Sequence, residues 1–554
     1  MRIFKQSSLL GMLAGILSLP LSTPLNALEF GSMGNTSAAM GGAGVALKHS
    51  AWGLYYNPAL LASDPKVKLG YSLGIGLKEH NLSKLTTIDV ANMQDTAERL
   101  VGMFSGSGGG TGGVSGSAIK DVMDTALDSV LGTGQGQGTN TQQKLESYLQ
   151  KHPDGNYSDL ASAVLSAVQG SNALTQEQKD LLGALSGSID FGNMDFSSNA
   201  SGAIKDALQN ITINKGGDSG LDKSVEDIGK VQEILKNNNL NVTSQNGVIL
   251  QISSKTMNEK LGSLGVAYFG SAYSSMSIKA DSSRMRLIIQ GGGGYYELQD
   301  NGNSFSLKLS DKDSYEKYSL IASLEGNSDA HKLIATTFFL SEIPIGYART
   351  FYLKHGNLNL GMTGKLMNAL SMQNQINLNV NTDFQKELTN FASLDGAISS
   401  NNFGVDLGAL YELDLPDFRY LTVGLVAKNI NSPAFASTLD KIVIKPQYRL
   451  GIGYNSRFFN AAFDADLAPN DLLAFSNIKQ QSQMIGGGIS FDFRYIDVRA
   501  GAMKDLRQDT GLILTGGVNV LGFLDIALQA STKTMEDTSI PQYLNLRVGG
   551  SFSF

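Results

Sequence analysis

Apolar and polar residues alternate with a period of two in many short segments of this chain. The first is VKLGYSLGIGLK at residues 67–78, which puts Val, Leu, Tyr and Ile on one face and Lys, Gly and Ser on the other. Such alternation predicts a β-strand with one apolar face. Twelve later segments share the pattern: residues 264–271, 347–353, 358–364, 403–413, 421–427, 448–454, 461–467, 489–495, 496–502, 512–520, 524–530 and 543–554.

These thirteen segments are a lower bound on the number of strands. Residues 285–309, which contain the turn signal GGGG at 291–294, and residues 376–380 are candidates for further strands. Bacterial outer-membrane barrels have an even number of strands. If the segments form such a barrel, we expect fourteen antiparallel strands, to within about two.

The charged residues of these segments lie opposite the apolar face, at Asp406, Asp464, Asp466, Asp492, Arg494, Asp497, Arg499, Asp525 and Arg547. In a soluble β-sandwich this face would meet water and the apolar face would pack in a core, which explains each segment taken singly. The number of strands, an export signal and a C-terminal aromatic residue together favour an all-β transmembrane barrel. Its polar residues, including the Asp464 and Asp466 pair, would then be solvated charges of a wet or plugged lumen.

The last segment, YLNLRVGGSFSF, carries Phe552 and Phe554 on its apolar face. A strand with one apolar and one polar face that ends on Phe is typical of the closing strand of an outer-membrane barrel. We therefore interpret these two residues as the C-terminal barrel signal. The partners expected from this interpretation are outer-membrane lipid and the barrel-assembly machinery.

The N-terminal residues have the three parts of a secretory signal peptide. Arg2 and Lys5 precede an uncharged apolar run at residues 9–21, and small residues follow near Ala27, where we expect cleavage. A membrane-spanning anchor is disfavoured because the run is shorter than the ~20 residues that a spanning helix needs. Residues 1–27 are therefore predicted to direct export, and the predicted location is the outer membrane of a Gram-negative bacterium.

Composition excludes several classes of function. Cysteine is absent, which rules out disulfides, thiolate–metal sites and thioredoxin-like chemistry. The net charge of −7 comes from interspersed charges of both signs, so no nucleic-acid partner is expected. The 63 glycines outnumber the 11 prolines, which suits strands that bend around a barrel and backbone packed tightly inside it.

The stretch at residues 83–260 differs in kind, because it is rich in Gly, Ser, Asn and Gln. Low-complexity runs at 105–113 and 132–140 separate short segments with helical spacing. These segments are residues 118–131, 158–168, 175–185, 203–208 and 224–235, and SGSAIKD at 115–121 is echoed by SGAIKD at 201–206. We predict a helical insertion after the first strand, extracellular if both termini are periplasmic; a poorly ordered surface loop is the alternative.

Residues 28–66 are too rich in glycine for a stable helix and have too little alternation for a strand. The run MGGAGVAL at 40–47, followed by Tyr56-Asn57-Pro58-Ala59, resembles the plug of FadL-like outer-membrane proteins, the family of long-chain fatty-acid and aromatic-hydrocarbon channels. The resemblance implies a fourteen-stranded barrel with a small-residue plug and an Asn-Pro-Ala turn inside it. The insertion and the closing strands favour the conjugal-transfer TraF-like branch, which is related to PorV-like secretion proteins.

The plug residues implied are Gly41, Gly42, Gly44, Asn57, Pro58 and Ala59. Pro58 fixes its own backbone angle and pushes Asn57 into an extended or turn conformation, while glycines allow close approach to an inner wall. A surface turn before the first strand is the alternative for Asn57 to Ala59. The predicted division is signal 1–27, plug 28–66, first strand 67–82, insertion 83–260 and remaining barrel 261–554.

No catalytic motif is present, and the glycine tracts lack the strand and helix of a phosphate loop. The five histidines, His49, His80, His152, His331 and His355, show no metal-ligand spacing, and no cofactor is expected. We therefore predict a non-enzymatic channel for hydrophobic small molecules. Its possible ligand-lining residues are Met33, Met40, Leu47, Trp52 and Tyr55.

The alternative is a non-transporting membrane partner of a conjugation, secretion or surface-attachment apparatus that uses the insertion as an interaction module. In that case the partner would be an envelope complex rather than a hydrophobic small molecule. Nonspecific porin function ranks third, because a plug would occlude the lumen.

Overall fold

The computed structural model describes residues 28–554 except 90–91, 93–115, 133–139, 177–178, 180–181, 183–190, 194–209, 215–218, 292–293, 301, 303, 326–327, 380–381, 383–395, 440 and 474–479. The expected signal peptide and most of the two low-complexity runs lie outside the described residues. The same holds for the predicted helix at 203–208 and for most of the one at 175–185.

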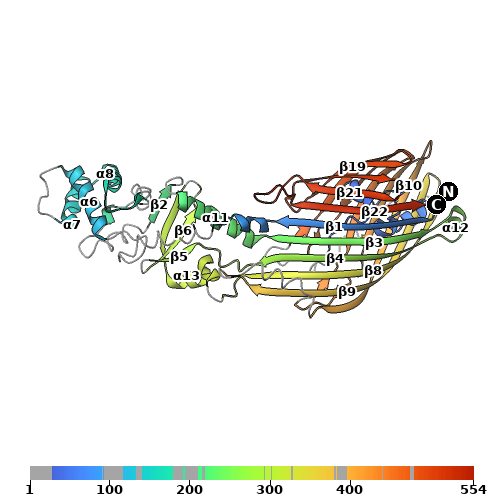
Figure 1. Cartoon of the computed structure of the whole chain (residues 1–554), viewed down its shortest axis with the longest axis horizontal. Coiled ribbons are helices and arrows are strands. Elements are labelled where there is room, and N and C mark those ends of the chain that lie inside the picture. The colour runs from blue at the N-terminus through green and yellow to red at the C-terminus, as the bar shows by residue number, and fades with distance from the viewer. Residues whose placement is uncertain are drawn as a thin grey trace, which may run out of the picture.

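Fourteen antiparallel strands form a closed barrel, as predicted (Figure 1). They are β1 (Lys68–His80), β3 (Asn239–Ile252), β4 (Ser263–Lys279), β8 (Lys332–Leu353), β9 (Gly356–Asn377), β10 (Ile398–Leu415), β11 (Arg419–Lys428), β14 (Gln447–Asn455), β15 (Phe459–Asp466), β18 (Met484–Asp492), β19 (Ile496–Asp505), β20 (Leu512–Val520), β21 (Leu524–Ser531) and β22 (Tyr543–Ser553). Each strand pairs with the next, and the seam joins β1 to β22 with Lys68 opposite Ser553.

The two faces of each strand differ as the alternation predicted. Leu73 and Ile345 project outward with 61% and 58% of their surface exposed, as expected for side chains that meet lipid. Arg547 and Lys365 project inward and are only 1% and 5% exposed. The inner face is therefore polar but covered, because other parts of the chain fill the lumen.

Strand β3 corrects the predicted boundary of the insertion, which was expected to continue to residue 260. The insertion ends before Asn239, and β3 and the short helix α12 (Lys255–Lys260) follow it. Ser244 and Asn246 interrupt the apolar face of β3, so its alternation is weak in the sequence. Pairing with β1 and β4 on both sides makes it a strand nonetheless.

The candidate strands at residues 285–309 do not belong to the barrel. They form β5 (Ile288–Gly291), β6 (Gly294–Asp300) and β7 (Ser304–Ser310), which join β2 (Asn210–Asn214) in a separate sheet of order β2-β7-β6-β5. Their apolar residues, such as Ile289 and Tyr296, pack in a core outside the barrel instead of facing lipid. Of the candidate at residues 376–380, the described residues 376–379 add no further strand, because β9 continues to Asn377.

That sheet belongs to a distal domain, made of the described residues of 81–238 and 280–331. Its helical elements are η1 (Leu82–Thr87), α6 (Gly116–Leu131), α7 (Thr141–Lys151), α8 (Ser158–Gly170), η2 (Phe191–Asn193), α11 (Ser219–Lys236), α13 (Lys312–Tyr318) and α14 (Leu320–Leu324). Three of the predicted helical segments are therefore confirmed, as α6, α8 and α11. The domain has its own apolar core and extends beyond the end of the barrel opposite the C-terminus (Figure 1).

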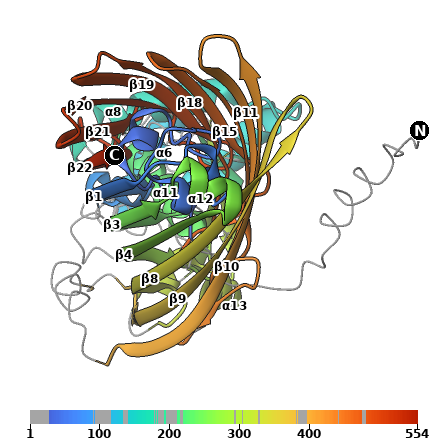
Figure 2. The same ribbon diagram turned by 90° about the vertical axis from the view of Figure 1, so that its right-hand side faces the viewer.

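The segment before β1 lies inside the barrel (Figure 2). It contains three short helices, α2 (Asn35–Ala39), α3 (Gly53–Tyr56) and α4 (Leu60–Ser63), and nearly all of its residues from 33 to 64 are buried. None of the helices in the described part of the chain is both long and apolar enough to cross a membrane.

Candidate functional site: the filled lumen

Two glycines of the plug motif, Gly41 and Gly44, stand where no side chain fits. Gly41 has φ +66°, and a Cβ there would lie 2.5–2.6 Å from backbone atoms of Gly487 and Ala502. Its N–H donates to the hydroxyl of Thr515 on β20 at 3.0 Å. The backbone of the plug therefore touches the backbone of the wall, which only glycine permits.

Asp464 holds the next part of the motif. Its Oδ2 accepts hydrogen bonds from the N–H groups of Gly44 at 2.8 Å and Val45 at 3.0 Å. Its neighbour Asp466 accepts from Arg449 Nε at 2.6 Å. The prediction that Asp464 and Asp466 are solvated lumen charges is wrong, because the plug and Arg449 cover them and leave them 3% and 4% exposed.

The Asn57-Pro58-Ala59 turn lies against the inner wall rather than at the surface. Asn57 is fully buried in the extended conformation that a following proline favours. Its Nδ2 donates to the carbonyl of Ala409 on β10 at 3.0 Å, and its Oδ1 accepts from Ala59 N–H at 3.1 Å. A Cβ on Gly408 would lie 2.0 Å from Asn57 Oδ1, so glycine is needed on the wall as well.

One side of the plug is joined to the wall mainly by hydrogen bonds. On β20 and β21, Thr515 Oγ1 donates to Ala39 O and Gln529 Nε2 donates to Ala38 O, both at 2.8 Å. On β11, Thr422 Oγ1 donates to Ala46 O at 2.7 Å. Displacement of this side would require all these buried polar groups to find new partners.

The other side of the plug, which faces β3, β4 and β8, is apolar. Trp52 and Tyr55 contact Phe269 of β4, with ring centroids 6.4 and 5.4 Å apart. This cluster consists of Phe30, Met33, Val45, Ala51, Trp52, Leu54, Tyr55, Tyr56, Leu61, Ala62, Ile249, Ala267, Phe269, Ala348 and Val426. Contacts within this cluster are dispersive. Hydrogen bonds on this side lie at the end of the plug before β1, where Gln251 of β3 donates to Leu61 O at 3.0 Å and Asn258 of α12 donates to Ala62 O at 3.0 Å.

The structure brings together three of the five possible ligand-lining residues. Met33, Trp52 and Tyr55 share the apolar cluster, whereas Met40 and Leu47 pack separately with Ala43 and Ala462. All five are buried, with at most 8% of their surface exposed. Whether they contact a ligand stays a prediction.

Buried ion pairs lie along the inner wall and between the wall and the plug. Lys48 pairs with Glu412 at 2.6 Å and joins the plug to β10. Within the wall, Lys365 lies 3.0 Å from Asp406, and Arg499 lies 2.7 Å from Asp525. Because an isolated buried charge is costly, these pairs hold the plug and the strands in one arrangement.

Arg547 of β22 crosses the seam beneath β1. Its Nη2 donates to the carbonyl of Gln245 on β3 at 2.7 Å, and its Nε lies 3.2 Å from Ser72 Oγ. Gly74 lets the guanidinium pass, since a Cβ there would lie 2.4 Å from Nη1. At this level the ladder between β1 and β3 is interrupted, and Gly74 N–H donates to the Asn246 side chain at 3.2 Å.

Two loops from the distal end also fold into the lumen. The loop between β11 and β14 forms the hairpin of β12 (Ala434–Phe435) and β13 (Ile442–Val443), and the loop between β15 and β18 contains β16 (Asn470–Asp471) and β17 (Gln481–Ser482). Phe435 and Leu473 from these loops pack with Phe338 on the inner wall. Sequence analysis missed this inward packing, although the apolar residues between two predicted strands were a signal for it.

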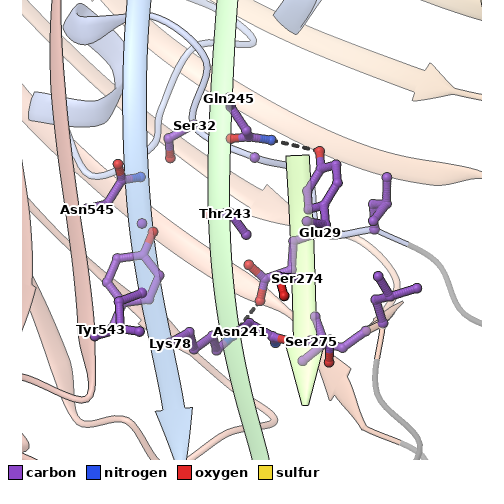
Figure 3. Close-up of a pocket in the computed structure, with 17 residues that line it drawn as sticks. Glu29, Ser32, Lys78, Asn241, Thr243, Gln245, Ser274, Ser275, Tyr543 and Asn545 are labelled. Atoms are coloured by element: carbon purple, nitrogen blue, oxygen red, sulfur yellow. Dashed lines mark hydrogen bonds and ion pairs between the residues drawn. The ribbon is translucent and has the colours of Figure 1, made fainter. Parts of the chain in front are cut away.

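A cavity of about 70 Å³ remains on the distal side of the plug. It lies between the plug, the inward loops and the seam strands (Figure 3). Tyr543 and Asn545 of β22 and Lys78 of β1 line one side, and Glu29 of the plug reaches Lys78 to form an ion pair. Leu28, Tyr273, Leu472 and Leu473 supply an apolar side. The cavity is smaller than the roughly 150 Å³ that holds a benzene molecule in a protein interior.

The fold and the lumen define a closed, plugged β-barrel of the outer-membrane type. Residues 167–466, more than half of the chain, match the model of the family described as "F plasmid transfer operon, TraF, protein". The chain belongs to this family. Comparison with curated protein sequences gives no match.

Solved structures similar to the chain include two hydrocarbon transporters. The toluene transporter TodX of Pseudomonas putida is 11% identical, with 96% of this chain and 98% of that chain covered and a TM-score of 0.34. The toluene transporter TbuX of Ralstonia pickettii is 10% identical, with 95% and 98% covered and a TM-score of 0.34.

Proposed function

We propose that this protein is an outer-membrane channel that admits small hydrophobic molecules and is held closed here by its plug and inward loops. One observation carries the proposal: a strip of aromatic side chains leads along the inner face of β4 to the plug, flanked by the polar side chains of Ser271 and Glu342. Tyr273 and Phe338 lie at its distal end, 6.3 Å apart, and Phe269 lies four residues before Tyr273 on the same face of β4. Phe269 then contacts Trp52 and Tyr55 of the plug.

The strip matters because the inner face of a membrane barrel is ordinarily polar. At its end, a hydrophobic molecule could replace the contacts of Trp52 and Tyr55 with Phe269 without breaking a hydrogen bond between these rings and the wall. The hydrogen-bonded side of the plug offers no such exchange. We therefore expect the part of the plug that carries Trp52 to move away from the wall when a ligand passes. The side that faces β20 and β21 is expected to stay attached.

The test is a disulfide that fixes the apolar side of the plug. A Cβ on Gly70 would lie 3.5 Å from the Cβ of Ala51, which is within the range of a disulfide, and the chain has no other cysteine. In liposomes, Ala51→Cys/Gly70→Cys is expected to take up a hydrophobic fluorescent probe when reduced and to lose that uptake when oxidised. The single variant Ala51→Cys controls for the oxidant. Equal uptake in both redox states would contradict a moving plug.

A second function is favoured by the distal domain, which is far larger than a pore requires. Its buried core includes Leu127, Leu145, Leu160 and Tyr296, so it is a folded body that the barrel anchors at the membrane. In this reading the protein is a non-transporting partner of an envelope apparatus, in line with the conjugative name of its family.

In-cell cross-linking separates the two functions. Cross-links from Lys120 or Lys151, which are exposed on α6 and α7, to an envelope complex would support the partner function. The reduced disulfide variant would then take up no probe. Uptake without such cross-links would support the channel.

A further inference from the structure

The inner wall of β8 and β9 carries an apolar patch near the distal end of the lumen. Phe338 and Leu340 alternate inward from β8, and Met367 and Ala369 do so from the neighbouring strand β9. All four are at most 3% exposed. Since a water-filled lumen would not select such residues, the patch exists to be covered by something apolar.

In this structure the cover is the β12–β13 hairpin. The ring of Phe435 meets Phe338 edge to face, with centroids 5.7 Å apart and planes at 62°. Ile442 and Ile444 complete the contact, and all three hairpin residues are at most 2% exposed. The hairpin thus packs one aromatic ring and two aliphatic side chains against the apolar patch of β8 and β9.

Side-chain hydrogen bonds to β9 and β10 attach this hairpin to the wall. Its ladder consists of two residue pairs, Ala434 with Val443 and Phe435 with Ile442. On β9, Thr438 Oγ1 bonds to the N–H and C=O of Gln373 at 2.7 and 2.6 Å, and Ser437 bonds to Ser371 at 2.8 Å. On β10, Asn402 Nδ2 donates to Ala434 O at 2.7 Å, and Ser400 Oγ accepts from Ala436 N–H at 3.2 Å. Thr438 is exposed and Ser437 is half-buried, so water can take over the hydrogen bonds of these two hairpin residues when the hairpin leaves.

Space already exists beside the patch. The cavity of about 70 Å³ and the apolar cluster share Leu28, Tyr273 and Leu473. Withdrawal of Phe435 would leave the volume of its ring empty against Phe338, which contacts Tyr273 of the cavity wall. The cavity on the other side of Tyr273 adds the polar groups of Lys78 and Asn545.

We infer that the patch beneath the β12–β13 hairpin is a binding site for an apolar ligand group about the size of a phenyl ring, and that Phe435 occupies it when no ligand is bound. The ligand class rests on the proposed channel function. Binding exchanges one apolar group for another, so the buried contacts are kept while the hairpin swings to the mouth. The ligand thereby removes the cover that closes the strip leading to the plug.

The first test removes the occupant. Phe435→Ala frees the site, and the affinity for N-phenyl-1-naphthylamine, measured by its fluorescence with the detergent-solubilised protein, is expected to rise about tenfold because the competing ring is gone. Phe418→Ala is the matched control, because Phe418 is 81% exposed in the turn between β10 and β11 at the opposite end of the barrel. Unchanged affinity in Phe435→Ala would overturn the inference.

The second test locks the hairpin without altering the patch. The hydroxyls of Ser371 and Ser437 are 2.8 Å apart, so Ser371→Cys/Ser437→Cys is placed to form a disulfide. Probe binding is expected to fall at least about tenfold on oxidation and to return on reduction. Equal binding in both states would overturn the inference. Redox-dependent binding together with absent liposome uptake would instead overturn the channel function and leave the site standing.

Discussion

Gly41 is fixed both by its backbone conformation and by its surroundings. Its positive φ disfavours any side chain, and its missing Cβ is where Gly487 and Ala502 approach. Gly42 next to it has φ +77°, but the nearest atoms to a Cβ there are 3.5 Å away. A substitution at Gly42 would therefore cause conformational strain alone, whereas a substitution at Gly41 would cause strain and steric overlap.

Gly41→Ala is expected to destabilise the folded barrel by about 3 kcal/mol, from about 1 kcal/mol of strain and about 2 kcal/mol of overpacking. Gly42→Ala should show only the strain, about 1 kcal/mol. The measurement is the denaturant midpoint of the folded band, which migrates differently from the boiled protein on a gel. Equal midpoints for the two variants would contradict the close approach of plug and wall.

At the scale of elements, His331 joins the distal domain to the barrel. It is fully buried just before β8, where its Nδ1 accepts from Asp281 N–H at 3.3 Å and its Nε2 bonds to Ser323 Oγ at 2.7 Å. The carbonyl of His331 accepts from Leu378 N–H after β9 at 2.8 Å. A neutral imidazole satisfies these contacts, with Nδ1 as acceptor and Nε2–H as donor.

Burial lowers the pKa of His331 to about 4, with Arg284 lowering it further and Asp281 opposing the shift. Between about pH 6.5 and 4, His331 therefore binds more protons in the unfolded state than in the folded state. The contact between the distal domain and the barrel loses stability as the pH falls through this range. Limited proteolysis should cut near residues 281–331 progressively faster over this range. His331→Gln should flatten that dependence, whereas His355→Gln, at an exposed turn, should not.

Strand β3 shows why an element can escape sequence analysis. Thirteen strands have clear alternation of their own, but the outward face of β3 carries Ser244 and Asn246 in its middle. Its conformation is fixed by the ladders to β1 and β4 and by Arg547, which reaches the carbonyl of Gln245. None of these partners is a near neighbour in the sequence.

At the scale of the whole molecule, the two ends of the barrel differ. Lys68 and Ser553 lie at one end, where the turns between strands are short, and the distal domain extends from the other (Figure 1). If the chain ends are periplasmic, as in bacterial barrels of this kind, the distal domain is outside the cell.

Trypsin added to intact cells is then expected to release peptides from the distal domain, beginning at exposed Lys120 and Lys151. Arg419, which begins β11 directly after the turn from β10 at the other end, should be cut only after the outer membrane is permeabilised. Early cleavage at Arg419 with an intact distal domain would reverse the orientation.

The sequence alone determined thirteen of the fourteen barrel strands, the apolar and polar face of each, and the plug at residues 28–66, because periodicity and glycine content are local properties. The tertiary structure decided which buried groups meet: Asp464 with the N–H groups of Gly44 and Val45, and Phe435 with Phe338. It also assigned residues 285–309 to the distal sheet and closed the lumen with loops. Such pairings join residues that are far apart in the chain, so their energies exist only once the barrel has closed around the plug.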